Sequence, residues 1–226
     1  GTPPGRLRIG FATTKFTGEA IHPDCVEAVD KTAKLLESLG HHVEPTFPSA
    51  LNDPKAAARF SALWATNMAT TRDGLANILG RPVTENDVEL MNWVMAEFAK
   101  NLSAVDYANA LNAAGMFRRN VAQWWADGWD LLLTPTVSAP PLPVGMSRNN
   151  PADPNETGRI SVDWIPFTSQ FNTTGQPAIS LPMHWNEAGL PVGIQLVAAY
   201  GREDILIRIA AELEASAPWD HRHPNI

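Results

Sequence analysis

Residues 171–182 read FNTTGQPAISLP, and residues 189–199 read GLPVGIQLVAA. Each stretch introduces an apolar run of strand length with a Gly-x-Pro tripeptide, and the two runs cover residues 178–183 and 192–198. Between them lie Asn186, Gly189 and Pro191, which are typical turn residues. This spacing predicts two strands joined as an antiparallel hairpin.

The N-terminal part of the chain carries a different strand pattern. Residues 7–12 (LRIGFA) form an apolar run, and residues 43–47 resume as an extended segment. Between them, His22-Pro23-Asp24 opens a predicted helix that Gly40 ends, because proline suits the first helical position and glycine suits the C-terminal cap. A strand, a helix and a strand at this spacing predict a parallel crossover unit.

A long helical region follows, and then the chain returns to strands. Capping-box patterns at Thr84-x-x-Asp87 and Ser103-x-x-Asp106 predict two helix starts. Residues 130–134 (DLLLT) predict a buried strand, residues 135–158 an irregular loop, and residues 162–174 one short helix. We therefore predict an α/β fold with a mixed β-sheet flanked by α-helices. The expected organisation is a single domain over 1–226 with a helical insertion at about 51–128.

The composition argues against several classes of protein, including nucleic-acid-binding and membrane-spanning proteins. The 226 residues carry a formal net charge of -7, which gives no electrostatic reason to bind nucleic acid or anionic lipid. No apolar run reaches the length of a membrane span, and the first residues lack the apolar block of a signal peptide. The single cysteine fits a reducing compartment, so we expect a cytoplasmic protein without an intrachain disulfide.

The sequence shows no self-sufficient catalytic group. Ser180 lies inside a predicted strand without the Gly-x-Ser-x-Gly turn of a hydrolase nucleophile, so we interpret it as structural. Cys25 falls on the apolar face of a predicted helix and is interpreted as a core thiol. The adjacent His41 and His42 would point to opposite faces of a strand, and the other histidines form no metal pattern. We therefore predict no catalytic residue, no metal and no cofactor within these residues.

Two aromatic or proline-rich features leave alternatives open. Trp124, Trp125 and Trp129 could stack a sugar, although helical spacing favours core packing. Residues 140–143 (PPLP) could bind as a polyproline segment, although a structured loop is favoured in so apolar a chain.

An ordered set of motifs resembles the C-terminal part of the amidase signature family. The motifs are residues 164–199 (WIPFTSQFNTTGQPAISLPMHWNEAGLPVGIQLVAA), residues 130–136 (DLLLTPT) and the ending APW at 217–219. The resemblance implies hydrolysis of amide bonds by a serine nucleophile, a bridging second serine and a lysine base. In the family these groups lie in an N-terminal half, which has no counterpart here, so none is carried over and a missing N-terminal half is the expected partner.

The resemblance also implies where a substrate would lie. In the family, the segment that matches 165–172 and the loop that matches 135–145 border the acyl-binding cavity. We therefore expect substrate-binding roles for Ile165, Phe167, Thr168 and Asn172. Members that act on a glutamine amide place an acidic residue near the start of this segment. Here Ile165 and Pro166 stand in its place, which favours an apolar or aromatic small-molecule amide and an acylamidase.

A second function class stays open. The chain could be a non-catalytic relative that binds a small amide or a protein partner without turnover. A homodimer is possible under either reading.

Overall fold

The computed structural model describes residues 2–53, 56–146, 150, 152–153 and 155–222. The chain divides into two compact units. The sheet unit comprises Gly1–Asp53, Arg118–Leu142 and Ile165–Ile226, and the helical unit comprises Pro54–Phe117 and Pro143–Trp164. We describe each unit by itself, and the predicted single domain stays a prediction.

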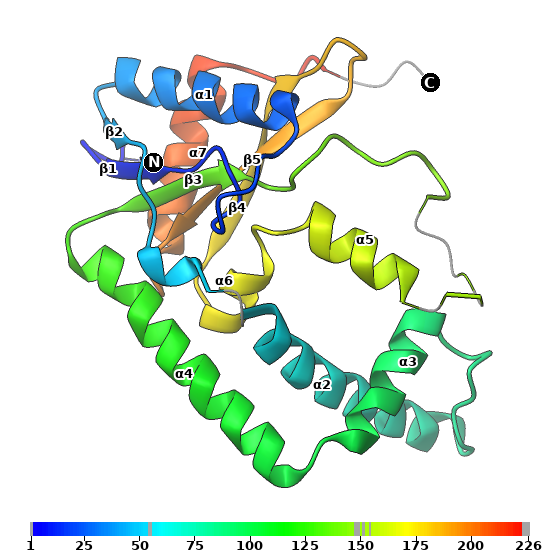
Figure 1. Ribbon diagram of the computed structural model, residues 1–226. Helices are drawn as coiled ribbons and strands as arrows, with labels where there is room; N and C mark the ends of the chain where they lie inside the picture. Colours follow the sequence, from blue (N-terminus) through cyan, green and yellow to red (C-terminus); the bar gives the residue numbers. More distant parts are fainter. Residues whose placement is uncertain (1, 54–55, 147–149, 151, 154, 223–226) are drawn as a thin grey trace. The chain divides into compact units, whose positions relative to one another are not determined.

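The sheet unit is built on one five-stranded mixed sheet (Figure 1). Its order is β2-β1-β3-β5-β4. Strand β1 pairs in parallel with both β2 and β3, whereas β5 runs antiparallel to both β3 and β4. The strands are β1 (Arg8–Phe11), β2 (His42–Glu44), β3 (Leu131–Pro135), β4 (Ala178–Trp185) and β5 (Pro191–Ala198). The predicted mixed sheet flanked by helices is confirmed.

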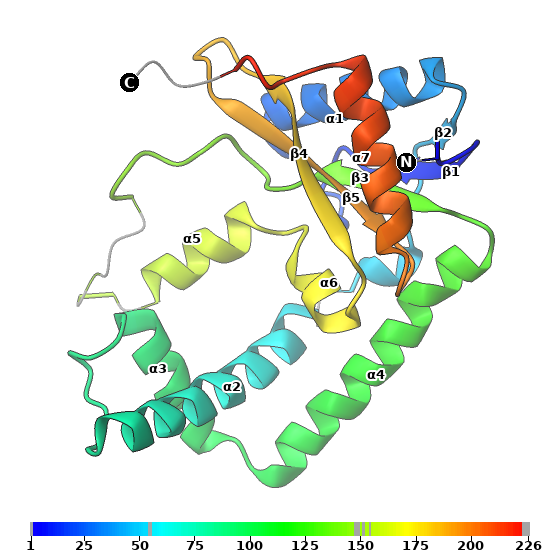
Figure 2. The same cartoon turned by 180° about the vertical axis from the view of Figure 1, so that it is seen from behind.

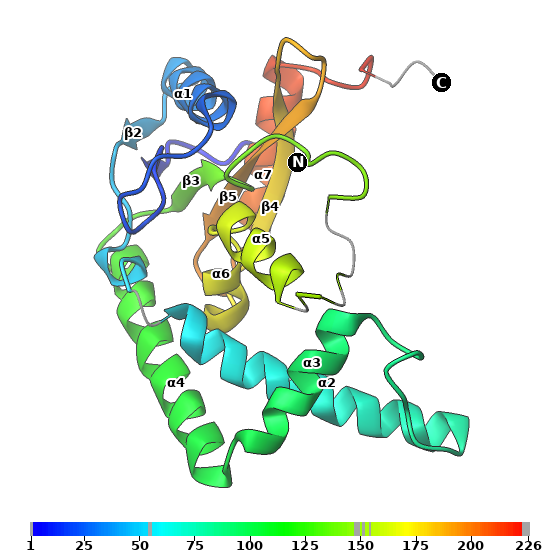
Figure 3. The ribbon, with the colours of Figure 1, turned by 45° about the vertical axis from the view of Figure 1, so that its right-hand side comes forward.

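The hairpin predicted from the opening motifs is confirmed as β4 and β5, which lie side by side (Figure 3). Asn186 and Gly189 close its turn, where the Gly189 N–H donates to the Asn186 carbonyl oxygen at 2.9 Å. Gly189 has φ +74°, a backbone conformation that favours glycine.

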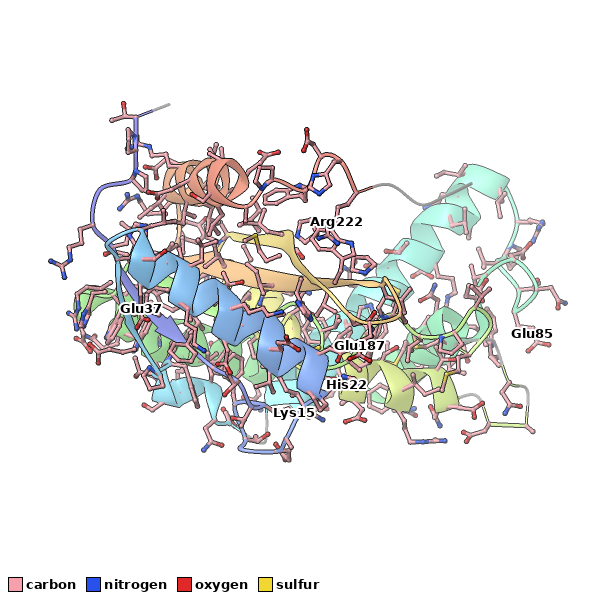
Figure 4. All side chains as sticks on the ribbon, turned by 90° about the horizontal axis from the view of Figure 1, so that it is seen from above. Lys15, His22, Glu37, Glu85, Glu187 and Arg222 are labelled. Carbon is pink, nitrogen blue, oxygen red and sulfur yellow. The ribbon has the colours of Figure 1, made fainter. Side chains whose placement is uncertain are left out.

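Helix α1 (Pro23–Ser38) forms the crossover between β1 and β2, as predicted. Its N-cap is His22, whose Nδ1 accepts a hydrogen bond from the backbone N–H of Asp24 at 3.2 Å. Gly40, at φ +96°, reverses the chain after the helix. Figure 4 labels His22 and Glu37 near the two ends of this helix, which lies over the sheet.

One face of the sheet is mostly apolar. Alternate strand residues, including Ile9, Leu133 and Leu196, are fully buried in one core with α1 and α7 (Glu203–Ser216). Figure 2 shows α7 running along β4 and β5. We call this the apolar face, and its burial of leucine and isoleucine is the main source of stability in the sheet unit.

The second face is mixed. Gly10 lies here under the ring of Trp124, and a Cβ at Gly10 would lie 2.5 Å from the Thr46 carbonyl oxygen and 2.6 Å from that ring. Only glycine fits this close approach. Further along the same face, Thr134, Gln195 and Ser180 align across β3, β5 and β4. We call these three residues the polar row.

Helices fill the chain between β2 and β3. They are η1 (Ser49–Leu51), α2 (Ala56–Leu79), α3 (Leu90–Phe98), η2 (Ala99–Asn101) and α4 (Ala104–Ala126). Within the helical unit α2 packs beside α3, where Arg72 forms an ion pair with Glu97 at 2.6 Å (Figure 3).

The two capping-box predictions have different outcomes. Ser103 and Asp106 form the reciprocal bonds of a capping box at the start of α4, as predicted. Asp87 also accepts hydrogen bonds from Thr84, but the chain there forms a turn and α3 begins only at Leu90, so this helix start was wrong. The same local bond serves both a turn and a helix start.

The single helix predicted over 162–174 is also corrected. The structure contains two helices, α5 (Glu156–Trp164) in the helical unit and α6 (Ser169–Thr174) in the sheet unit. Pro166 lies in the break, and proline has no N–H for a helical hydrogen bond.

Candidate substrate-pocket wall

Residues 165–168 form a tight turn that leads into α6, and residues 169–172 are its first residues. The Thr168 carbonyl oxygen accepts hydrogen bonds from the backbone N–H groups of Phe171 at 3.1 Å and Asn172 at 3.2 Å. The side chains of Ile165 and Thr168 are half-buried, and Asn172 is exposed. These three side chains remain accessible at the surface of the sheet unit.

Phe167 has a different place from the other predicted substrate residues. Its side chain is fully buried, and its ring meets Phe16 edge-on with centroids 5.5 Å apart. Phe16 also contacts Phe47 at 5.2 Å and Phe171 at 6.5 Å. In the sheet unit Phe167 therefore supports the turn from beneath, within an aromatic cluster. A substrate-binding role for any of the four residues stays a prediction.

One buried carboxamide is bonded to this turn. The Nε2 of Gln195 donates to the Phe167 carbonyl oxygen at 3.0 Å and to the Thr134 hydroxyl at 3.1 Å. The Thr134 hydroxyl in turn donates to the Pro135 carbonyl oxygen at 2.9 Å. Thr134 and Gln195 are both buried, so these bonds are shielded from water.

The loop after β3 is fixed at its start. The Thr136 N–H donates to the Gly193 carbonyl oxygen at 3.0 Å, and the Thr136 hydroxyl lies 2.7 Å from that of Ser180. A Cβ at Gly193 would lie 3.0 Å from both hydroxyl oxygens, so glycine leaves room for this pair. The Ser138 carbonyl oxygen accepts from the His22 N–H at 2.9 Å, which joins the loop to the start of α1.

Neither nucleophile candidate is activated. Among the described residues, the Ser180 hydroxyl is bonded to Thr136, which is not a general base. Cys25 is fully buried, and this burial, with a smaller effect from Asp24, raises the pKa of its thiol to about 11. A thiol that stays protonated at neutral pH is a poor nucleophile.

The adjacent histidines have separate surroundings. The Nδ1 of His41 is buried and accepts from the Leu7 N–H at 3.2 Å, while its Nε2 lies 3.2 Å from Glu212. His42 is exposed and is bonded to Glu44. In the part of the chain that the structure describes, no group of three or more His, Cys, Asp or Glu residues could hold a metal ion.

The tryptophans pack on one another. Trp124 stacks on Trp129 with centroids 4.8 Å apart and meets Trp125 edge-on at 4.9 Å. The Arg8 guanidinium lies 4.4 Å from the Trp129 ring centre. Because these rings stack on one another and on an arginine, the structure favours a packing role for the three tryptophans and not a role in binding sugar.

Sequence reasoning missed the role of Gln195. The residue belongs to the GLPVGIQLVAA stretch that carries part of the family resemblance, but no role was predicted for it. A buried glutamine among Ile194, Leu196 and Val197 was the available signal, since a polar group in such a run needs partners.

No helix among the described residues combines the length and apolar character that a bilayer span requires.

The comparisons with known proteins agree with this architecture. The family model described as Amidase matches residues 2–207. The 6-aminohexanoate-cyclic-dimer hydrolase of Paenarthrobacter ureafaciens is 36% identical over 99% of this chain and 46% of its own length. The chain thus spans about half the length of the curated relatives it matches.

Solved structures give the same result. The structure of a 6-aminohexanoate cyclic dimer hydrolase complexed with substrate superposes with a TM-score of 0.92 at 36% identity, covering 99% of this chain and 48% of that one. A bacterial aryl acylamidase shares the fold, with a TM-score of 0.72 at 18% identity over 96% of this chain and 45% of that one. On the family match and this fold, the chain belongs to the amidase signature family.

Proposed function

We propose that this chain is the C-terminal part of an amidase-type hydrolase that cleaves the C–N bond of carboxylic amides. The observation that carries the proposal is the match to a 6-aminohexanoate-cyclic-dimer hydrolase over 99% of this chain and 46% of that protein. The unactivated Ser180 and Cys25 support it, because a hydrolase of this kind needs its nucleophile in other polypeptide.

The work is divided between the two halves. The missing N-terminal half would supply the serine nucleophile, the second serine and the lysine base. This chain would supply the sheet and one wall of the acyl cavity, formed by residues 165–172 and the loop that begins at Pro135. A wall of this kind orients the substrate and excludes water, which lowers the barrier without direct contact with the breaking bond.

The substrate we propose is a small amide with an apolar or aromatic acyl group. None of the accessible side chains of residues 165–172 is charged, and Ile165, Thr168 and Asn172 are among them. Apolar contact with Ile165 and hydrogen bonding to Thr168 or Asn172 suit an uncharged amide. The relative is named for hydrolysis of a 6-aminohexanoate cyclic dimer, and an acylamidase activity for this protein is part of our proposal. A cytoplasmic location and a homodimer stay predictions.

Hydrolysis of p-nitroacetanilide by the full-length protein tests the proposal. We expect release of p-nitroaniline by the full-length protein, loss of this activity when the signature lysine of the N-terminal half is changed to alanine, and none from residues 1–226 alone. A folded full-length protein that hydrolyses no amide in a panel of anilides would contradict the proposal. Amide binding without turnover, measured by calorimetry, would favour the non-catalytic alternative.

A further inference from the structure

The polar row lies where both proposed wall segments meet the sheet. Gln195 is the middle member, on β5, with Thr134 opposite it on β3 and Ser180 opposite it on β4. Gln195 lies between Ile194 and Leu196, which are fully buried. An apolar residue here would also be compatible with a buried strand, so the carboxamide needs a reason of its own.

The two donor bonds of Gln195 reach different wall segments. One Nε2 bond goes to the carbonyl oxygen of Phe167, inside the turn at 165–168. The other goes to the Thr134 hydroxyl, which is bonded to the carbonyl oxygen of Pro135, where the loop begins. The two segments are about thirty residues apart in the chain. The amide group is bonded directly to the first and reaches the second through the Thr134 hydroxyl.

We propose that Gln195 is a positioning residue that sets the spacing of the two acyl-cavity walls, an inference that rests on the proposed amidase function. The carboxamide cannot release one segment without leaving a buried carbonyl or hydroxyl oxygen short of a donor. It therefore holds residues 165–168 and Pro135 in one fixed arrangement, which would select acyl groups by their size.

The chain offers a matched control in Gln176. This glutamine is also buried, and it lies beyond the other end of α6. Its Nε2 donates to the Ala198 carbonyl oxygen at 3.3 Å, and its Oε1 accepts from the Thr174 hydroxyl at 3.1 Å. Loss of Gln176 removes one buried bond to the last residue of α6 and one to the last residue of β5, without touching residues 165–168 or Pro135.

The test compares Gln195→Met with Gln176→Met in the full-length protein. Methionine keeps the length of glutamine and lacks both donors. We expect Gln195→Met to change the ratio of kcat/KM for p-nitroanilides of acetic and hexanoic acid by about tenfold, through KM. The pH profile should not move, because the nucleophile and base lie elsewhere. Gln176→Met should leave the ratio within about twofold.

A second measurement does not depend on activity. Hydrogen exchange of the Phe171 and Asn172 amides, which bond to Thr168, should speed up by about tenfold in Gln195→Met and stay unchanged in Gln176→Met. If Gln195→Met fails to fold, Thr134→Val removes the Gln195–Thr134 and Thr134–Pro135 bonds and leaves the bond from Gln195 to Phe167 in place. It should shift the acyl-size ratio in the same direction, with slow exchange retained at Phe171 and Asn172.

The outcomes separate the two proposals. An active wild type with an unchanged acyl-size ratio in Gln195→Met, or equal shifts in both glutamine variants, overturns the positioning role. A wild type that hydrolyses neither anilide overturns the proposed function instead. In that case the exchange rates still decide whether Gln195 holds the turn.

Discussion

The two faces of the five-stranded sheet differ in what their residues do. On the apolar face, buried side chains such as Ile9, Leu133 and Leu196 pack against α1 and α7. On the second face, Thr134 and Gln195 are also buried but make specific hydrogen bonds to the turn and the start of the loop. Apolar packing tolerates other side chains of similar volume, whereas a buried hydrogen-bonded group has few substitutes. The first face therefore stabilises the fold, whereas under our proposal the second face positions the wall of the acyl cavity.

Truncation of the apolar face should have the largest effect on stability. Leu196→Ala removes a fully buried side chain at the centre of the core and should lower the free energy of unfolding by about 2–5 kcal/mol. Urea unfolding measures this change. Ile207, on the exposed side of α7, is the control, because Ile207→Ala should change the value by less than about 0.5 kcal/mol. Equal losses in both variants would contradict the assigned core.

A side chain at Gly10 should disturb the second face by overpacking. Gly10→Ala would press a methyl group against the Thr46 carbonyl oxygen and the Trp124 ring, at a cost of about 1–3 kcal/mol. At Gly74, inside α2, an added methyl group would meet no atom within 4 Å. Gly74→Ala should therefore stabilise the protein by about 0.5–1 kcal/mol. Thermal unfolding should show a lower melting temperature for Gly10→Ala and a higher one for Gly74→Ala. An unchanged melting temperature in Gly10→Ala would contradict the close packing of Gly10 against Thr46 and Trp124.

Raising the pH should lower the free energy of unfolding, because the Cys25 thiol is buried in the core on the apolar face. The thiol has a pKa of about 11 in the fold, above the usual value, so at pH 9–10 the unfolded chain loses its proton while the folded chain keeps it. Stability should therefore fall with rising pH, by about 1 kcal/mol between pH 9 and pH 10. The free energy of unfolding is measured against pH for wild type and Cys25→Ala, and the difference between the two slopes gives the contribution of the thiol. Identical slopes would show that the thiol is not buried as described.

The smallest effect is expected at the exposed end of the polar row. Ser180→Ala removes the hydroxyl bond to Thr136 and should cost less than about 1 kcal/mol, because Ser180 is exposed and water can replace it. Urea unfolding of Ser180→Ala and Gln195→Met compares the two losses in the free energy of unfolding, and we expect the larger loss in Gln195→Met. A larger loss from Ser180→Ala than from Gln195→Met would reverse their ranking.

Local patterns predicted the strands and the hairpin well. Alternation and turn residues at 178–198 are short-range signals, and they indicated β4, β5 and their antiparallel pairing. The break at Pro166 was equally readable and was overlooked in favour of one helix. At Thr84 the local signal itself was ambiguous, because the side chain of Asp87 bonds to Thr84 in a turn as it would in a helix.

The candidate site was less predictable. Thr134 and Gln195 are 61 residues apart, and their bond depends on the register between β3 and β5. A register shift of one residue would turn Gln195 to the other face, so the partner of Gln195 is defined only once β3 and β5 have paired. The burial of Phe167 depends on Phe16 and Phe47, which reach it only through the tertiary fold.

Covalent labelling of the nucleophile tests the central claim most directly. The full-length protein would be treated with a fluorophosphonate, which phosphonylates activated serines, and the modified peptide identified by mass spectrometry. Our account predicts a single labelled serine outside residues 1–226, in the missing half. A label on Ser180, or on any serine within these 226 residues, would show that the chain carries its own nucleophile and would contradict the account.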